Sequence, residues 1–205
     1  MSHPVIDAIE QRISANFFDA ARPLSDAQIE TLTALATRAP TAYNLQNWRF
    51  IAVRTAEAKA RLRAVAWNQP KVTDAAVVFI VCGVLADPAT LAQRLQPSVE
   101  AGLMPAGMVQ TWVDAARGQY LEQPQSRRDE AIRTASLGAA TLMLAAQGMG
   151  LATGPMTGFD PQGVAREFAL RPDEVPAILV AVGHAAPGNW PQKPRRPLAE
   201  VLDFA

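Results

Sequence analysis

Two stretches far apart in the chain carry residue types that suit a phosphate group. The tail sequence Lys-Pro-Arg-Arg-Pro (193–197) places Lys193 and Arg195 close together on a proline-stiffened backbone. A fork-shaped guanidinium beside an ammonium matches a tetrahedral dianion. Arg12 and Ser14 offer a second set of phosphate donors near the N-terminus. Spacing alone leaves two interpretations of the tail open, a phosphate clamp and a solvated basic linker.

Lysine is scarce in this chain. Lys59, Lys71 and Lys193 are the three lysines among 19 basic residues. Lysine offers a compact point charge that arginine does not, so a lysine in an arginine-biased sequence can mark a site that uses such a charge. Chance explains so small a number equally well, and the count by itself decides nothing.

Three other candidate sites favour structural explanations or stay open. The glycines of Gly148-Met-Gly150-Leu-Ala-Thr-Gly154 end a predicted helix, whereas a dinucleotide-binding loop opens one, so we expect a helix cap. Cys82, the one cysteine, lies in an apolar run and is expected to be buried and inert. His184 follows the last predicted strand and suits a ligand contact or a surface position.

Composition limits the class of protein. The 205 residues are 49% hydrophobic and 19% charged, which is typical of a globular domain. Nineteen basic and 19 acidic residues cancel, so no overall charge draws the chain to nucleic acid or to an anionic membrane. We expect one domain over residues 1–186 with a C-terminal arm over 187–205. Asp7 and Glu10 interrupt any signal-peptide pattern, so a cytoplasmic location is expected.

Helices and strands must position these residues. Along the chain the predicted helices and strands neither alternate strictly nor segregate fully, which favours the α+β class. Apolar spacing and capping residues predict helices near residues 6–13, 26–39, 55–65, 129–148 and from 161. Strands are predicted at 50–53, 75–82 and 177–182. The stretch 97–125 is the least readable, with a helix expected around 108–115. The segment 132–146 is apolar on almost every side, so we expect a central helix or an interface helix.

Four blocks carry a resemblance to a known family. They are IEQRISANFF (9–18), APTAYNLQNWRF (39–50), NQPK (68–71) with Asp74 and the apolar run after it, and GLATGPMTGFD (150–160) with the basic tail. In this order and spacing the set resembles the nitroreductase family of FMN-dependent NAD(P)H oxidoreductases. The resemblance covers about residues 5–201, apart from 97–125. It implies an α+β nitroreductase-like fold with a central, mainly antiparallel sheet flanked by helices.

The resemblance also implies a residue-by-residue cofactor site for FMN. Arg12 and Ser14 would hold the FMN phosphate together with Lys193 and Arg195. Ile13 and Asn16 belong to the same block but stand where basic residues are frequent, so this phosphate site is less positive than usual. The remaining cofactor-binding positions implied are Asn68 and Lys71 at the pyrimidine edge of the ring, Pro155, Met156, Thr157 and Gly158 near N5, and Pro40, Thr41, Ala42 and Asn44 from the other subunit.

The implied chemistry needs one side chain in particular. Reduced flavin carries negative charge near N1 and O2, so a cation there favours reduction, and Lys71 is the catalytic candidate. The family builds its active site between two intertwined subunits, which implies a homodimer with NAD(P)H as co-substrate. Quinones, nitroaromatics and small conjugated carbonyls are the expected acceptors. A specialised reductase of the semialdehyde type, a dehalogenase, a heterocycle oxidase and a non-enzymatic flavin carrier remain alternatives.

Overall fold

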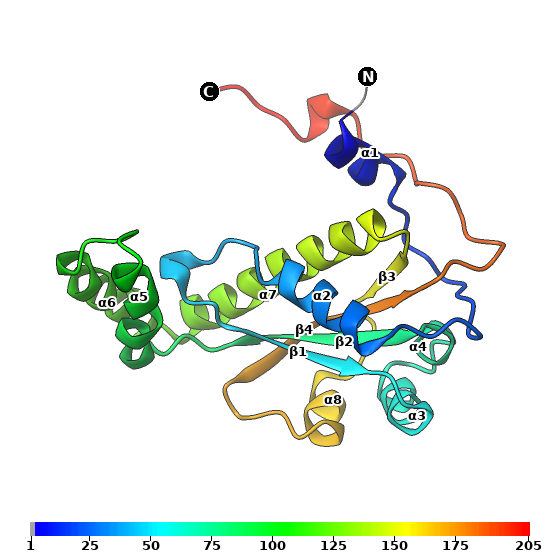
Figure 1. The fold of residues 1–205 in the computed structure, drawn as a ribbon, viewed down its shortest axis with the longest axis horizontal. Helices are drawn as coiled ribbons and strands as arrows, with labels where there is room; N and C mark the ends of the chain where they lie inside the picture. The colour runs from blue at the N-terminus through cyan, green and yellow to red at the C-terminus, as the bar shows by residue number, and fades with distance from the viewer. Residues whose placement is uncertain (1–2) are drawn as a thin grey trace.

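The computed structural model describes residues 3–205, and a four-stranded antiparallel sheet forms its centre (Figure 1). The strands lie in the order β1-β2-β4-β3. Their bounds are β1 Trp48–Val53, β2 Val77–Val84, β3 Ala152–Met156 and β4 Glu174–Gly183. All eight residues of β2 are buried, because helices cover both faces of this central strand. The expected α+β fold with a mainly antiparallel sheet is therefore confirmed.

Helices cover the two faces of the sheet in separate layers. One layer consists of α2 (Asp26–Ala36) and the long α7 (Pro124–Gly148), and it packs on alternate residues of β2 and β4, among them Phe79 and Val180. The other layer consists of α3 (Ala56–Val65), α4 (Lys71–Asp74) and α8 (Pro161–Glu167). These two layers enclose separate apolar cores on opposite sides of the sheet (Figure 1).

Two parts of the chain lie outside these layers. The helices α5 (Leu91–Glu100) and α6 (Gly107–Tyr120) form a small cluster with their own apolar core at one end of the sheet (Figure 1). At the other end, α1 (Pro4–Gln11) and the end of the C-terminal arm project from the body of the molecule (Figure 1). Short 3₁₀ turns complete the chain at Ala42–Asn44, Pro88–Thr90 and Leu198–Glu200.

Capping residues locate several helices where the sequence predicts them. Ser25 and Gln28 form the predicted capping box of α2. Thr55 caps α3 and Asp160 caps α8. At the end of α7, Gly150 has φ +71° and the Leu151 N–H donates to the Ala146 carbonyl, so the glycines form a helix cap as expected.

The sequence prediction missed β3 and part of the stretch 97–125. β3 contains Gly154 and Pro155, which are rare inside strands, and it lies at one edge of the sheet, where β4 is its one neighbour among the four strands. Its edge position tolerates a proline because one side of the strand needs no ladder hydrogen bond. The helix α6 is longer than the expected 108–115, and α5 continues past Pro97 to Glu100.

The apolar helix α7 is buried along one face only in the single chain. Gly138, Ala139 and Leu142 lie against the sheet and α2, whereas Leu137 is 39% exposed on the opposite side. Of the two expectations for this helix, a wholly buried position is wrong for the isolated chain. The second expectation, an interface helix, stays a prediction, because the outer face of α7 carries the exposed Leu137.

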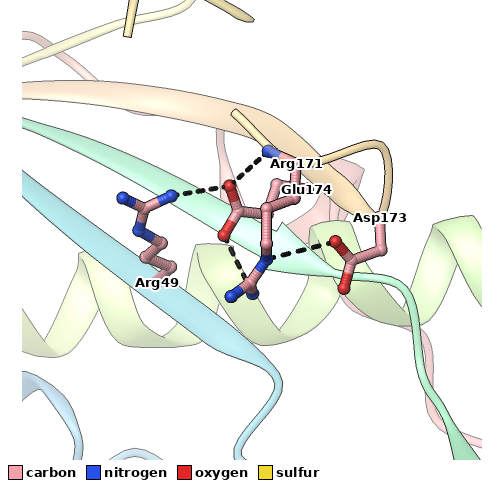
Figure 2. A network of polar contacts seen from close by, with 4 residues as sticks. All are labelled: Arg49, Arg171, Asp173 and Glu174. Carbon is pink, nitrogen blue, oxygen red and sulfur yellow. Dashed lines mark hydrogen bonds and ion pairs between the residues drawn. The ribbon is translucent and has the colours of Figure 1, made fainter. Parts of the chain in front are cut away.

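A buried carboxylate fastens the start of β4 (Figure 2). The Glu174 side chain is fully buried, and the Arg49 Nη1 lies 2.8 Å from its Oε2. Arg171 contributes its Nη2 at 2.9 Å from Oε1 and its backbone N–H at 2.8 Å from Oε2, while Asp173 pairs with the same guanidinium. Because Arg49 lies on β1 and Glu174 on β4, the ion pair spans β2.

Cys82 lies on β2, near this ion-pair network. Burial is the main cause that raises the pKa of the Cys82 thiol to about 12, and the neighbouring Glu174 carboxylate adds to the shift. The thiol therefore stays protonated and unreactive at neutral pH, in agreement with the expectation from the sequence.

Gly83 allows α7 to approach β2. A Cβ atom at residue 83 would lie 1.9 Å from the Ala131 carbonyl oxygen. Neither atom can avoid the clash by a side-chain rotation, because the Cβ is fixed to the strand and the carbonyl to the helix backbone. We predict that Gly83→Ala lowers the free energy of unfolding by about 2 kcal/mol or more. Gly118→Ala in α6, where a Cβ meets nothing within 4 Å, is the control and should be neutral or gain about 0.5–1 kcal/mol. Urea unfolding measures both, and equal stability of the two variants would contradict this account.

Candidate functional site

The N-terminal segment after α1 runs along the exposed edge of β3. Ser14 forms a parallel bridge with Thr153, and the Ala15 N–H donates to the Thr153 carbonyl at 2.8 Å. Phe18 then bridges to Ala185, just after β4. The segment 12–18 thus lies between the sheet edge and the beginning of the C-terminal arm.

A pocket between this segment and the arm collects cationic groups. Its lining includes Ser14 from the segment and Lys193 and Arg195 from the arm, together with Trp190, Pro191 and Gln192. We call it the cationic pocket. Three of the four residues predicted to hold a phosphate therefore meet in one place, although Lys193 and Arg195 lie 179 and 181 positions after Ser14.

Side-chain contacts fix the basic groups of the cationic pocket. The Lys193 ammonium lies 5.4 Å from the centre of the Trp190 ring, a cation–π geometry. Arg195 donates from Nη2 to the Gln192 side-chain oxygen at 2.8 Å. Gln192 in turn donates to the Arg12 carbonyl at 3.1 Å, so the backbone of Arg12 is joined to the pocket. The Arg12 guanidinium donates to the Ile13 carbonyl instead.

Lys71 lies beside the cationic pocket, in the first turn of α4. Its ammonium donates to the Asn16 side-chain oxygen at 3.1 Å. Asn16, Phe17, Gln69, Pro70, Lys71 and Asp74 line a second pocket, which we call the Lys71 pocket. Partial burial lowers the pKa of Lys71, and the nearby Lys193 lowers it further. Asn16, two residues after Ser14 of the cationic pocket, therefore holds Lys71, whose charge interacts with that of Lys193.

The three cations of this region have no carboxylate partner. Among residues 3–205, Lys71, Lys193 and Arg195 form no ion pair within 4.0 Å. Asp74 lines the Lys71 pocket but forms no ion pair with the Lys71 ammonium. Like charges held close together raise the free energy of the site, and an anion that binds there lowers it. This part of the chain also contains no cluster of three His, Cys, Asp or Glu side chains that could hold a metal ion.

The loop after β3 closes against the turn before α4. The Gln69 side chain donates to the Gly158 carbonyl at 2.8 Å. Trp67 and Asn68 have φ of 52° and 55°, and a Cβ at residue 158 would lie 2.8 Å from the Trp67 ring. Pro155 and Gly158 are half-buried and Thr157 is exposed, whereas the Met156 side chain belongs to the core. Asn68 and the 155–158 loop are therefore near neighbours, as the predicted site requires.

The predicted site residues 40–44 lie elsewhere in the single chain. Ala42 and Tyr43 pack against the cluster of α5 and α6, and the Tyr43 hydroxyl donates to Gln119 in α6. Asn44 lines an apolar pocket there with Trp112 and Met108. That cluster and α4 lie at opposite ends of the sheet (Figure 1). Within one chain, Pro40, Thr41, Ala42 and Asn44 are not brought to the cationic groups.

Sequence reasoning missed four side chains that build the two pockets. Trp190 and Gln192 line the cationic pocket, Gln69 joins the loop at Gly158, and Asn189 joins the arm to the segment 16–17. Their residue types give no signal of a binding site. The one hint is the basic cluster that begins at Lys193, one residue after Gln192 and three after Trp190.

Comparison with known proteins identifies the family and supports the fold. Residues 9–184 match the model of the nitroreductase family. The chain belongs to the nitroreductase family. YodC of Bacillus subtilis, provisionally named an NAD(P)H nitroreductase, is 32% identical over 197 residues, which cover 96% of each chain.

Two solved structures share the fold of this nitroreductase-family protein. A provisionally named nitroreductase of Exiguobacterium sibiricum, solved in complex with FMN, is 28% identical with a TM-score of 0.90 and covers 100% of this chain and 99% of its own. A provisionally named NAD(P)H:FMN oxidoreductase of Staphylococcus epidermidis is 25% identical with a TM-score of 0.88, covering 98% and 95%. Within residues 3–205, no helix combines the length and apolar character that crossing a membrane requires.

The charge coupling between Lys71 and Lys193 predicts a measurable titration. Folded Lys71 holds its proton less tightly than the unfolded chain, so the flavin-free protein gains stability as the pH rises from the lowered pKa towards 10.5. Lys193→Met should raise the pKa of Lys71 and narrow the pH range over which stability increases. NMR of ¹³C-methylated lysines measures the pKa of each lysine. Lys59, whose pKa is lowered by burial without a contribution from Lys193, is the internal control. If Lys193→Met changes the pKa of Lys71 and of Lys59 equally, or changes neither, the coupling between Lys71 and Lys193 is contradicted.

Proposed function

We propose that this protein binds FMN with the phosphate in the cationic pocket and uses it to oxidise NAD(P)H. The observation that carries the proposal is the set of unpaired cations that meets at Ser14. Lys193 and Arg195 supply two positive groups, and Ser14 supplies a hydroxyl donor. A phosphate dianion takes charge-assisted hydrogen bonds from such donors. The FMN-bound relative with the same fold supports this assignment.

The residues around the Lys71 pocket fit the remainder of FMN. Gly154 allows the segment that carries Asn16 to pack closely on β3, because a Cβ at that position would lie 2.4 Å from the Ala15 carbonyl oxygen. In the proposed complex, Asn68 binds the pyrimidine edge of the ring and Lys71 lies at its N1 and O2. Backbone groups of Pro155, Met156, Thr157 and Gly158 lie near N5, because the Met156 side chain is held in the core.

FMN, when bound, supplies two-electron transfer between NAD(P)H and an acceptor. The chain's own contribution is electrostatic. The Lys71 ammonium, positioned by Asn16, favours negative charge at the pocket it lines. Burial and the nearby Lys193 lower the pKa of Lys71, and an anionic neighbour would offset both effects by favouring the charged ammonium. No side-chain acid, base or nucleophile is required for this role. Quinones, nitroaromatics and small conjugated carbonyls are the proposed acceptors.

A homodimer completes the proposed site. The helix α1 has no buried residue, and Val5, Ile6 and Ile9 are each at least 50% exposed. Leu198 and Phe204 in the arm are 73% and 92% exposed, and the outer face of α7 carries exposed Leu137. Apolar surface of this extent favours burial against another subunit. In that dimer, residues 40–44 of each subunit would reach the FMN of the other.

The purified protein tests the proposed function. We expect a yellow protein with about one FMN per subunit that consumes NAD(P)H continuously when a quinone or nitroaromatic acceptor is supplied. Absorbance spectra with identification of the released flavin measure the first part, and steady-state kinetics measure the second. One reduction followed by no turnover with any acceptor would indicate a flavin carrier instead. Protein that fails to bind added FMN would reject the proposal.

The exposed face of α1 tests the proposed dimer. The substitutions Ile6→Glu and Ile9→Glu remove apolar side chains that no core of the single chain contains, so the fold should stay intact. Burying one isoleucine contributes about 1.5–3 kcal/mol, so each should weaken the dimer at least tenfold. Glu10→Gln on the same helix is the control. Sedimentation equilibrium decides, and a monomeric wild-type protein would contradict the dimer.

A further inference from the structure

The side chain of Asn189 uses its full hydrogen-bonding capacity between two distant segments. Its Oδ1 accepts the backbone N–H of Asn16 at 2.7 Å and that of Phe17 at 3.0 Å. Its Nδ2 donates to the carbonyls of Phe17 at 2.8 Å and Ala186 at 3.0 Å. A primary amide offers two acceptor sites and two N–H donors on one planar group. Asparagine is therefore the residue type that meets all four partners at this reach.

These bonds place the two halves of the cationic pocket relative to one another. Asn16 lies two residues after Ser14, and Asn189 lies four residues before Lys193. The arm from residue 190 onwards is exposed along its whole length, and its one regular element is the short turn Leu198–Glu200. Asn189 is the last half-buried residue before this exposed stretch. It therefore sets the direction in which the arm carries Lys193 and Arg195 past Ser14.

The same amide also bears on the Lys71 pocket. The Asn16 backbone N–H that Asn189 accepts belongs to the residue whose side-chain oxygen receives the Lys71 ammonium. Asn189 fixes the backbone of that residue, and Asn16 then holds Lys71. One side chain on the arm thus orders the segment between both pockets.

We propose that Asn189 is a positioning residue that builds the phosphate site by clamping the arm to the segment 16–17. The inference rests on the proposed function, because it assumes that the cationic pocket receives the FMN phosphate. Asn189 lies outside the lining of both pockets, so it acts through Lys193, Arg195 and Asn16. Its loss should affect ligands that carry the phosphate and spare those that lack it.

Affinities for FMN and riboflavin separate this role from a general contribution to folding. Riboflavin has the same ring and ribityl chain as FMN and lacks the phosphate. In the flavin-free full-length protein, Asn189→Ala should weaken FMN binding at least tenfold, because misplaced basic groups lose their charge-assisted contacts with the phosphate. Riboflavin affinity and the melting temperature should change little. Glu200→Gln, which alters an exposed ion pair with Arg196 on the same arm, is the control and should leave both affinities unchanged.

A double-mutant cycle tests whether Asn189 acts through Lys193. If it does, Asn189→Ala combined with Lys193→Met should weaken FMN binding by less than the product of the two single effects. Fluorescence titration of the flavin measures all four proteins. If Asn189→Ala does not fold, Asn189→Ser replaces it, because the smaller hydroxyl removes most of the same hydrogen bonds.

The outcomes distinguish this inference from the proposed function. Wild-type protein that binds FMN no more tightly than riboflavin overturns the phosphate site, and the inference falls with it. If Asn189→Ala prefers FMN over riboflavin as strongly as the wild-type protein does, the inference about Asn189 is overturned, and the proposed function stands. Equal losses for FMN and riboflavin with a lower melting temperature also overturn it, because they make Asn189 a residue of the fold. Loss confined to FMN, with effects that are not multiplicative in the cycle, supports it.

Discussion

Uncompensated positive charge is the constraint on which the rest of the site depends. Lys71, Lys193 and Arg195 gather beside Ser14 and Asn16 without a carboxylate within ion-pair distance. By contrast, the buried Glu174 on the other side of the molecule has two guanidinium partners (Figure 2). The buried carboxylate of Glu174 is thus neutralised, whereas the cations in the region around Ser14 have no ion-pair partner among residues 3–205. An anion completes that region, and the FMN phosphate has the charge and the shape to do so.

The order of strands brings the charged groups together. β3 lies at an edge of the sheet beside β4, so the segment before α2 can add to its free side through Ser14 and Thr153. After the end of β4, which lies next to β3, the chain passes Phe17 and Phe18 as it enters the arm. On the neighbouring face, Lys59 donates to the carbonyls of Thr73 and Ala75 at the end of α4, which anchors the helix that carries Lys71.

Local signals in the sequence predicted the elements that local interactions determine. The capping box at Ser25 and the apolar run of β2 depend on neighbours within a few residues. The structure contains both, with β2 two residues later than the predicted 75–82. β3 was missed because its glycine and proline argue against a strand unless its edge position is known. The outward face of α7 was also hidden, since an apolar helix looks alike whether another layer or another subunit covers it.

The candidate site was predicted by resemblance more than by local physics. Residue types alone suggested a phosphate clamp at Lys193 and Arg195, and the structure places both beside Ser14. The contributions of Asn189 and Gln192 could not be predicted, because their partners lie more than 170 positions away and no periodicity connects them. The roles of residues 40–44 depend on a second subunit, which no pattern within one chain describes.

The ionisation of the bound FMN phosphate tests the central claim most directly. The second pKa of a phosphate monoester is about 6 in water. Among three unpaired cations, the dianion is favoured, so ³¹P NMR of the FMN complex should show a bound phosphate whose pKa is well below that value. The chemical shift should then stay constant as the pH falls through 6. A bound phosphate that titrates like free FMN would contradict the account, because it would lie outside the cationic pocket.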